Sequence, residues 1–127
     1  MPRRCACTPH QTCDRCWALL VRAGEVPPPE MNEAQLQARV REVCKKLSLL
    51  HYHTKDSRKS ERGFVDSMII APTGGVLWAM ELKVEGATPT LDQERWLHAL
   101  SRVTRVESGI VRPSTLALFV QRLQEES

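Results

Sequence analysis

Residues 63–83, reading GFVDSMIIAPTGGVLWAMELK, contain two apolar runs on either side of a turn signal. The runs, 64–71 and 76–84, are rich in valine, isoleucine, phenylalanine and tryptophan, which favour β-strands. Residues 72–75 between them read PTGG, a composition typical of the turn in a β-hairpin. The sequence therefore predicts two antiparallel strands joined by a four-residue turn.

The register of this hairpin follows from its turn. If Ala71 pairs with Val76, counting outward pairs Asp66 with Glu81. Side chains alternate between the two faces of a strand, so Lys83 shares a face with both acids. Directly opposed residues have Cβ atoms about 5 Å apart. The hairpin is therefore expected to bring two carboxylates and an ammonium group together.

Two interpretations of this cluster are open. At a solvated end of the sheet, both acids are hydrated and Lys83 is a loose counterion. Inside an apolar hairpin, the acids repel each other and resist losing water, whereas a divalent cation such as Mg²⁺ takes carboxylate oxygens as ligands and keeps waters for exchange. A metal-bound water is then a nucleophile, and a nearby lysine stabilises charge on a phosphate. Because three charges converge on one face, we favour the second interpretation.

Residues 32–50 predict an amphipathic helix. Asn32 and Gln35 form a capping box, which is typical of a helix start. Glu33, in the first turn, falls on the apolar side of this helix. It is either stabilised there by the helix dipole or directed at a functional site. The apolar stripe consists of Leu36, Val40, Val43, Leu47 and Leu50.

Residues 49–54, LLHYHT, predict a short, partly exposed edge strand on which His51 and His53 share a face. Residues 55–62 then form a polar loop with four basic side chains and two acids. Charged loops are usually solvated, but this one directly precedes Asp66, where a phosphate backbone would approach the site. Two interpretations, solvated surface or contacts with DNA phosphates, therefore apply to Arg58, Lys59 and Arg62.

A second helix is predicted to begin at Thr90. Gln93 follows three residues later and completes another capping box, so its side chain is either a helix cap or a support for a catalytic group. A strand over 108–112 and a helix after Pro113 follow. The resulting order, α-β-β-β-α-β-α, predicts an α/β fold with a mixed β-sheet flanked by helices.

Four of the five cysteines lie near the start of the chain, in two closely spaced pairs. In a reducing cytosol, this pattern favours a tetrahedral Zn²⁺ site over disulfides. A redox pair or a disulfide clip is the alternative. Three prolines at 27–29 predict a stiff connector, so we divide the chain into a zinc-binding segment, 1–30, and a main domain, 31–127. The proposed zinc ligands are Cys5, Cys7, Cys13 and Cys16.

Length and composition set broad limits. A chain of 127 residues is expected to form one domain with a small appendage. Its net charge of +3 permits nucleic-acid binding without requiring it. No apolar run approaches 18 residues and no signal peptide opens the chain, so we expect a soluble, intracellular protein without membrane partners.

The residues around the hairpin resemble the signature of the PD-(D/E)xK nucleases. Residues 63–66, GFVD, are followed by fourteen residues and then by residues 81–83, ELK. More narrowly, residues 31–112 resemble the VRR-NUC family of replication-repair nucleases. One departure is Val65, which stands where the family usually has proline. Further residues that support the resemblance are Glu33, the segment 56–60, Gln93 and Trp96.

This resemblance implies a restriction-endonuclease-like core that hydrolyses DNA with Mg²⁺ or Mn²⁺. The metal ligands would be Asp66, Glu81 and the backbone carbonyl of Leu82. Lys83 would orient the attacking water or stabilise the phosphate, with Glu33 and Gln93 in supporting roles. The resemblance also implies an endonuclease for branched or replication and repair DNA, acting as a homodimer in the cytoplasm of a bacterium or a phage-infected host. The alternative, kept open by Val65, is a non-catalytic zinc-containing nucleic-acid-binding module with a vestigial nuclease fold.

Overall fold

The computed structural model describes residues 29–54 and 61–127 of the chain. In these ranges the element order is α-β-β-β-α-β-α, as predicted from the sequence. The elements are α2 (Glu33–Lys46), β1 (Leu50–His53), β2 (Ser67–Ala71), β3 (Val76–Leu82), α3 (Leu91–Ser101), β4 (Val106–Val111) and α4 (Leu116–Glu126).

The four strands form one mixed sheet in the order β1-β2-β3-β4. β1 and β3 both pair antiparallel with β2, whereas β3 and β4 are parallel. The hairpin has the predicted register, with Ala71 opposite Val76 and Met68 opposite Ala79. β4 begins at Val106, two residues earlier than predicted, because its pairing with β3 already starts opposite Leu77.

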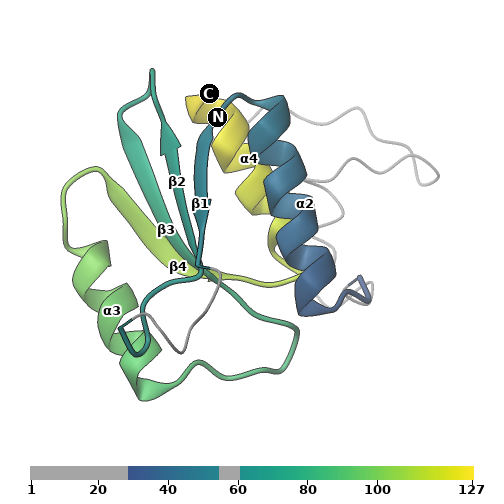
Figure 1. Ribbon diagram of the computed structural model, residues 1–127, viewed down its shortest axis with the longest axis vertical. Coiled ribbons are helices and arrows are strands. Elements are labelled where there is room, and N and C mark those ends of the chain that lie inside the picture. The colour runs from purple at the N-terminus through teal and green to yellow at the C-terminus, as the bar shows by residue number, and fades with distance from the viewer. Residues whose placement is uncertain (1–28, 55–60) are drawn as a thin grey trace.

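Helices cover the sheet from both sides (Figure 1). α2 and α4 contact each other on one side of the sheet, whereas α3 packs against β3 and β4 on the other. The main core lies between the sheet and the α2–α4 layer. Its fully buried side chains include Leu36 and Val40 of α2, Ile69 and Trp78 of the sheet, and Leu123 of α4.

The first predicted helix needs one correction. Its capping box is present, with the Asn32 side chain accepting from the backbone of Gln35. However, α2 ends at Lys46, and Leu50 is the first residue of β1 rather than the end of the apolar stripe. Leu50 is 60% exposed, because strand alternation points it away from the face that α2 covers.

Several sequence predictions lie outside the described residues. They concern the proposed zinc ligands Cys5, Cys7, Cys13 and Cys16, and the basic residues Arg58 and Lys59. Among the helices that are described, none is both long and apolar enough to cross a membrane.

Candidate active site

The chain that leads into Asp66 is packed against α3. Gly63 has a φ of +83°, and a Cβ at this position would lie 2.4 Å from the backbone carbonyl carbon of Asp92. Only glycine fits this close approach. Next to it, the rings of Phe64 and Trp96 pack edge to face, with centroids 5.2 Å apart. These contacts fix the path of the backbone just before the first acid.

Asp66 is held from two sides. Its backbone carbonyl accepts a hydrogen bond from the Thr54 amide at 2.9 Å, and its Oδ2 accepts one from the Leu82 amide at 3.0 Å. The strand pairing between β2 and β3 ends at Ser67, so the Asp66 side chain takes the place of the next backbone acceptor. As a result, its carboxylate points at β3 beside Glu81, as the predicted register requires.

Glu81, the second-to-last residue of β3, is buried, with only 2% of its surface exposed. Its Oε1 accepts a hydrogen bond from Gln93 Nε2 at 2.9 Å, while its buried Oε2 has no partner among the described residues. Burial, together with the nearby Asp66 carboxyl, raises the pKa of Glu81 to about 8. The two acids therefore form a close pair in a setting that penalises their charge.

Gln93 caps α3 and also contacts Glu81. Its Oε1 accepts from the Thr90 amide at 2.8 Å and its own amide donates to Thr90 Oγ1 at 3.1 Å, which completes the capping box of α3. The other end of the same side-chain amide donates to Glu81. A helix cap thus also orients a buried carboxylate.

Lys83 is the first residue after β3, two positions beyond Glu81, where continued strand alternation would place it on the same face. It is partly exposed, and its positive charge lowers the pKa of Glu81, opposing the effect of burial. Its backbone amide donates to the Val111 carbonyl at 3.0 Å, which keeps β3 paired with β4 up to this point. The buried Leu82 lies between Glu81 and Lys83 in the sequence, so its backbone is part of the same short segment.

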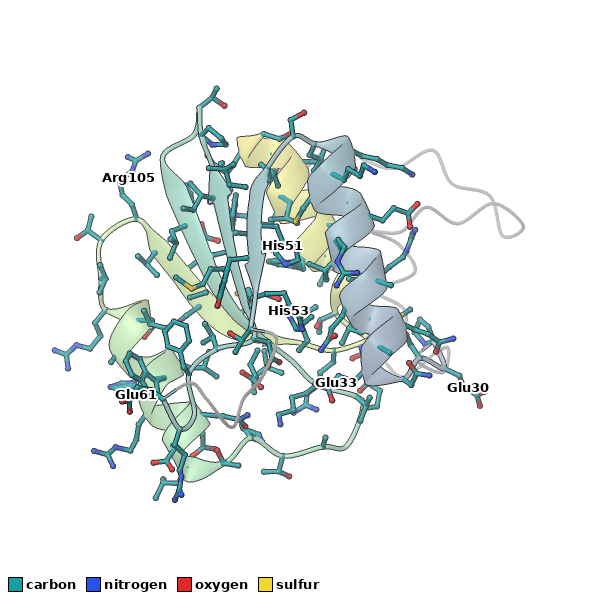
Figure 2. All side chains as sticks on the ribbon, viewed as in Figure 1. Glu30, Glu33, His51, His53, Glu61 and Arg105 are labelled. Carbon is teal, nitrogen blue, oxygen red and sulfur yellow. The ribbon has the colours of Figure 1, made fainter. Side chains whose placement is uncertain are left out.

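Glu33 has no hydrogen bond to either acid of this pair within the described residues. It is exposed, contrary to its predicted place on the buried stripe, because the buried part of α2 begins one turn later at Leu36. Figure 2 shows Glu33 on the first turn of α2, below His53 of the edge strand.

The described part of the chain contains no group of three or more histidine, cysteine, aspartate or glutamate residues arranged to hold a metal. Arg62, the one predicted DNA contact that is described, is exposed beside Gly63.

The sequence analysis did not identify Thr54 as part of the site. Thr54 holds the backbone on both sides of the Val65–Asp66 peptide, since its amide binds the Asp66 carbonyl and its Oγ1 donates to the Val65 carbonyl at 3.1 Å. Pairing β1 with β2 places it there, because His53 is opposite Ser67. The turn between β2 and β3 does not predict that register, since thirteen residues of sequence separate β1 from β2.

The donor set fits a divalent cation. Carboxylate oxygens are the ligands that Mg²⁺ and Mn²⁺ prefer, and Asp66 and Glu81 supply them side by side. The unpartnered, buried Oε2 of Glu81 is the specific sign, because a buried polar atom normally has a partner. A cation there would satisfy this atom and also reduce the repulsion between the two acids.

Comparison with known proteins supports the fold. A solved structure of a VRR_NUC domain matches this chain with a TM-score of 0.54 and 24% sequence identity, covering 73% of this chain and 94% of its own. No family model and no curated protein matches the sequence. The chain therefore has the fold of a VRR_NUC domain, a mixed sheet flanked by helices, as its sequence predicted.

Proposed function

We propose that this chain is a divalent-metal-dependent endonuclease that hydrolyses DNA phosphodiester bonds. The observation that carries the proposal is the pair of Asp66 and Glu81, held together with one buried, unpartnered carboxylate oxygen. The fold shared with a VRR_NUC domain supports it. A purely structural role is a poor explanation for the pair, because replacing buried charged groups with apolar ones is often neutral or stabilising.

Asp66 and Glu81 would hold the cation, Mg²⁺ or Mn²⁺, with the Leu82 carbonyl as a further ligand. When bound, the cation supplies positive charge at the phosphate and lowers the pKa of a coordinated water. The chain's own residues orient this chemistry. Leu82 and Thr54 fix Asp66, and Gln93 fixes Glu81. Lys83 would stabilise the negative charge that develops on the phosphate, a role that preorganised cations perform well.

The alternative, a vestigial nuclease that only binds nucleic acid, depended on Val65 in place of the proline. The contacts of Val65 weaken that argument. The side chain is fully buried, and the following Asp66 is held by the amides of Thr54 and Leu82. None of these bonds requires proline at position 65, so the substitution leaves the carboxylate pair in place.

The decisive experiment compares two substitutions in metal binding and in cleavage. Asp66→Asn retains an acceptor for the Leu82 amide but removes one negative charge, so Mn²⁺ affinity and cleavage should fall together. Lys83→Ala removes no ligand, so Mn²⁺ should still bind while the cleavage rate falls on the order of a hundredfold. Calorimetry with Mn²⁺ and cleavage assays on linear, nicked and branched DNA measure both effects.

Glu94→Gln is the matched control, since it removes an exposed acid next to Gln93 without touching the pair. It should bind metal and cleave like the unmodified chain. The assignment is wrong if no DNA is cleaved in either metal, or if Lys83→Ala cuts at the normal rate. A branched substrate cleaved in preference to linear duplex would add the repair-type specificity that the resemblance implies.

A further inference from the structure

A hollow of about 560 Å³ lies between α2 and the edge strand β1. Two permanent cations from α2, Arg41 and Lys45, and two histidines from β1, His51 and His53, line it. No acid is among the described residues of its lining. We call this surface the α2–β1 groove, and its charge favours an anionic ligand.

Helix and strand periodicity explain why these four side chains meet. Arg41 and Lys45 are four residues apart and share one face of α2. His51 and His53 are two residues apart and share one face of β1. Their neighbour Tyr52 is 61% exposed on the opposite face of the sheet. Figure 2 shows both histidines between β1 and α2.

The histidines carry a second, independent sign of a ligand. His51 Nε2 and His53 Nδ1 are buried, yet neither has a hydrogen-bond partner among the described residues. Burial lowers the pKa of His51, and the positive charges of His53 and Arg41 lower it further. An anion would offer acceptor oxygens to these rings and would reverse the unfavourable charge that His51 now experiences.

The cations of the groove are not paired with acids within the described ranges. Arg39 and Lys46, on the same helix, lie 3.7 Å and 3.3 Å from the carboxylate of Glu42. In contrast, Arg41 and Lys45 form no salt bridge within the described ranges. Among the described residues, the histidines and Cys44 of this groove do not form a group that could hold a metal.

We propose that the α2–β1 groove binds phosphate groups of a nucleic-acid strand. The groove follows β1 to His53. The amide of the next residue, Thr54, donates a hydrogen bond to the backbone carbonyl of Asp66. His53 pairs with Ser67, so its side chain and that of Asp66 lie on opposite faces of the sheet. A strand anchored in the groove would therefore pass around the end of β1 to reach the carboxylate pair. This last step rests on the proposed nuclease function, whereas phosphate binding does not.

Inorganic phosphate is the first probe. In NMR spectra at constant pH and ionic strength, the imidazole signals of both histidines should shift and saturate as phosphate replaces chloride. Arg41→Gln and Lys45→Gln should each weaken this response several-fold. Arg39→Gln removes the same charge from the same helix outside the groove and should leave the response intact. Histidine signals that ignore phosphate would overturn the proposal, as would an equal loss in Arg39→Gln.

Single-stranded oligonucleotides, with or without a 5′-phosphate, provide the second probe. With EDTA present to prevent cleavage, Arg41→Gln should lower affinity and reduce the slope of log K against log salt by about 0.7 for one lost contact. Dependence on the 5′-phosphate identifies a terminal monoester as the ligand, and equal binding identifies internal diesters. If Arg41→Gln and Lys45→Gln bind both oligonucleotides like the unmodified chain, the groove is not a phosphate site.

Failure of this proposal is distinguishable from failure of the nuclease assignment. Both binding measurements are independent of cleavage, so a groove that binds phosphate in an inactive protein would leave the present inference standing. Conversely, a protein that cleaves DNA normally while its groove variants show unchanged binding would contradict only the groove.

Discussion

Glu81 is the residue at which the proposed function would lower stability. Burial, together with the Asp66 carboxyl, raises its pKa from 4.5 to about 8. Between these two pH values, the folded protein holds a proton that the unfolded chain has already released. Where the native state binds more protons than the unfolded state, stability falls as pH rises. In the metal-free protein, the contribution of Glu81 to the free energy of unfolding should therefore decrease as the pH rises from 4.5 to 8.

Thermal unfolding in EDTA across this pH window tests the prediction. Glu81→Gln has no carboxyl to ionise and should show a flatter dependence, diverging from the unmodified chain as pH rises toward 8. Since one pKa unit corresponds to about 1.4 kcal/mol, the difference in unfolding free energy should reach a few kcal/mol. Parallel pH profiles for the two proteins would contradict the raised pKa.

Mn²⁺ should act in the opposite direction at the same residue. A cation competes with the proton for the Glu81 carboxylate, so it should raise the melting temperature more at pH 8 than at pH 6. At a hundredfold excess over its dissociation constant, a ligand stabilises the folded state by about 2.7 kcal/mol. Glu81→Gln should lose most of this stabilisation.

At the scale of elements, α3 connects helix capping to the candidate active site through Gln93. Thr90→Ala and Gln93→Ala both disrupt the capping box, and each should cost about 1 kcal/mol of stability. Only Gln93→Ala also removes the hydrogen bond to Glu81. It alone should reduce Mn²⁺-dependent cleavage at saturating metal. Equal losses of cleavage in the two variants would mean that Gln93 only starts the helix.

Local rules predicted much of this element structure. A four-residue turn determined the hairpin register, and with it the pairing that brings Asp66 beside Glu81. Both capping boxes were also predicted, since they depend on residues three positions apart. These features involve short stretches of chain, where hydrogen-bonding geometry leaves few alternatives.

Contacts between distant segments were not predictable in this way. Thr54 reaches Asp66 because β1 pairs with β2, although thirteen residues of sequence separate the two strands. Gly63 requires glycine because α3 approaches it at Asp92. Glu33 has the correct helical phase for the core, but phase does not tell how far along α2 the core extends. The hydrogen bond from Gln93 to Glu81 likewise depends on how α3 docks on the sheet.

At the scale of the whole molecule, the buried core cluster of the described residues runs from Leu36 of α2 to Leu123 of α4, and Met31 packs against it. The helix cap at Asn32 lies just before this cluster. We therefore expect a shortened chain that begins at Met31 to fold and to retain metal-dependent cleavage, with a melting temperature within a few degrees of the full chain.

The same comparison tests the proposed zinc site, because shortening the chain removes four of its five cysteines. The full chain should carry about one equivalent of Zn²⁺, and the four thiols should resist modification until a chelator is added. The shortened chain should carry none.

The remaining cysteine, Cys44, should stay unreactive for another reason, since burial raises the pKa of this thiol to about 11 and leaves almost no thiolate at neutral pH. Chelation should therefore release four reactive thiols in the full chain, and only denaturation should release the fifth. Four thiols that react without a chelator would refute the zinc site, and a shortened chain that fails to fold would refute the division at residue 31.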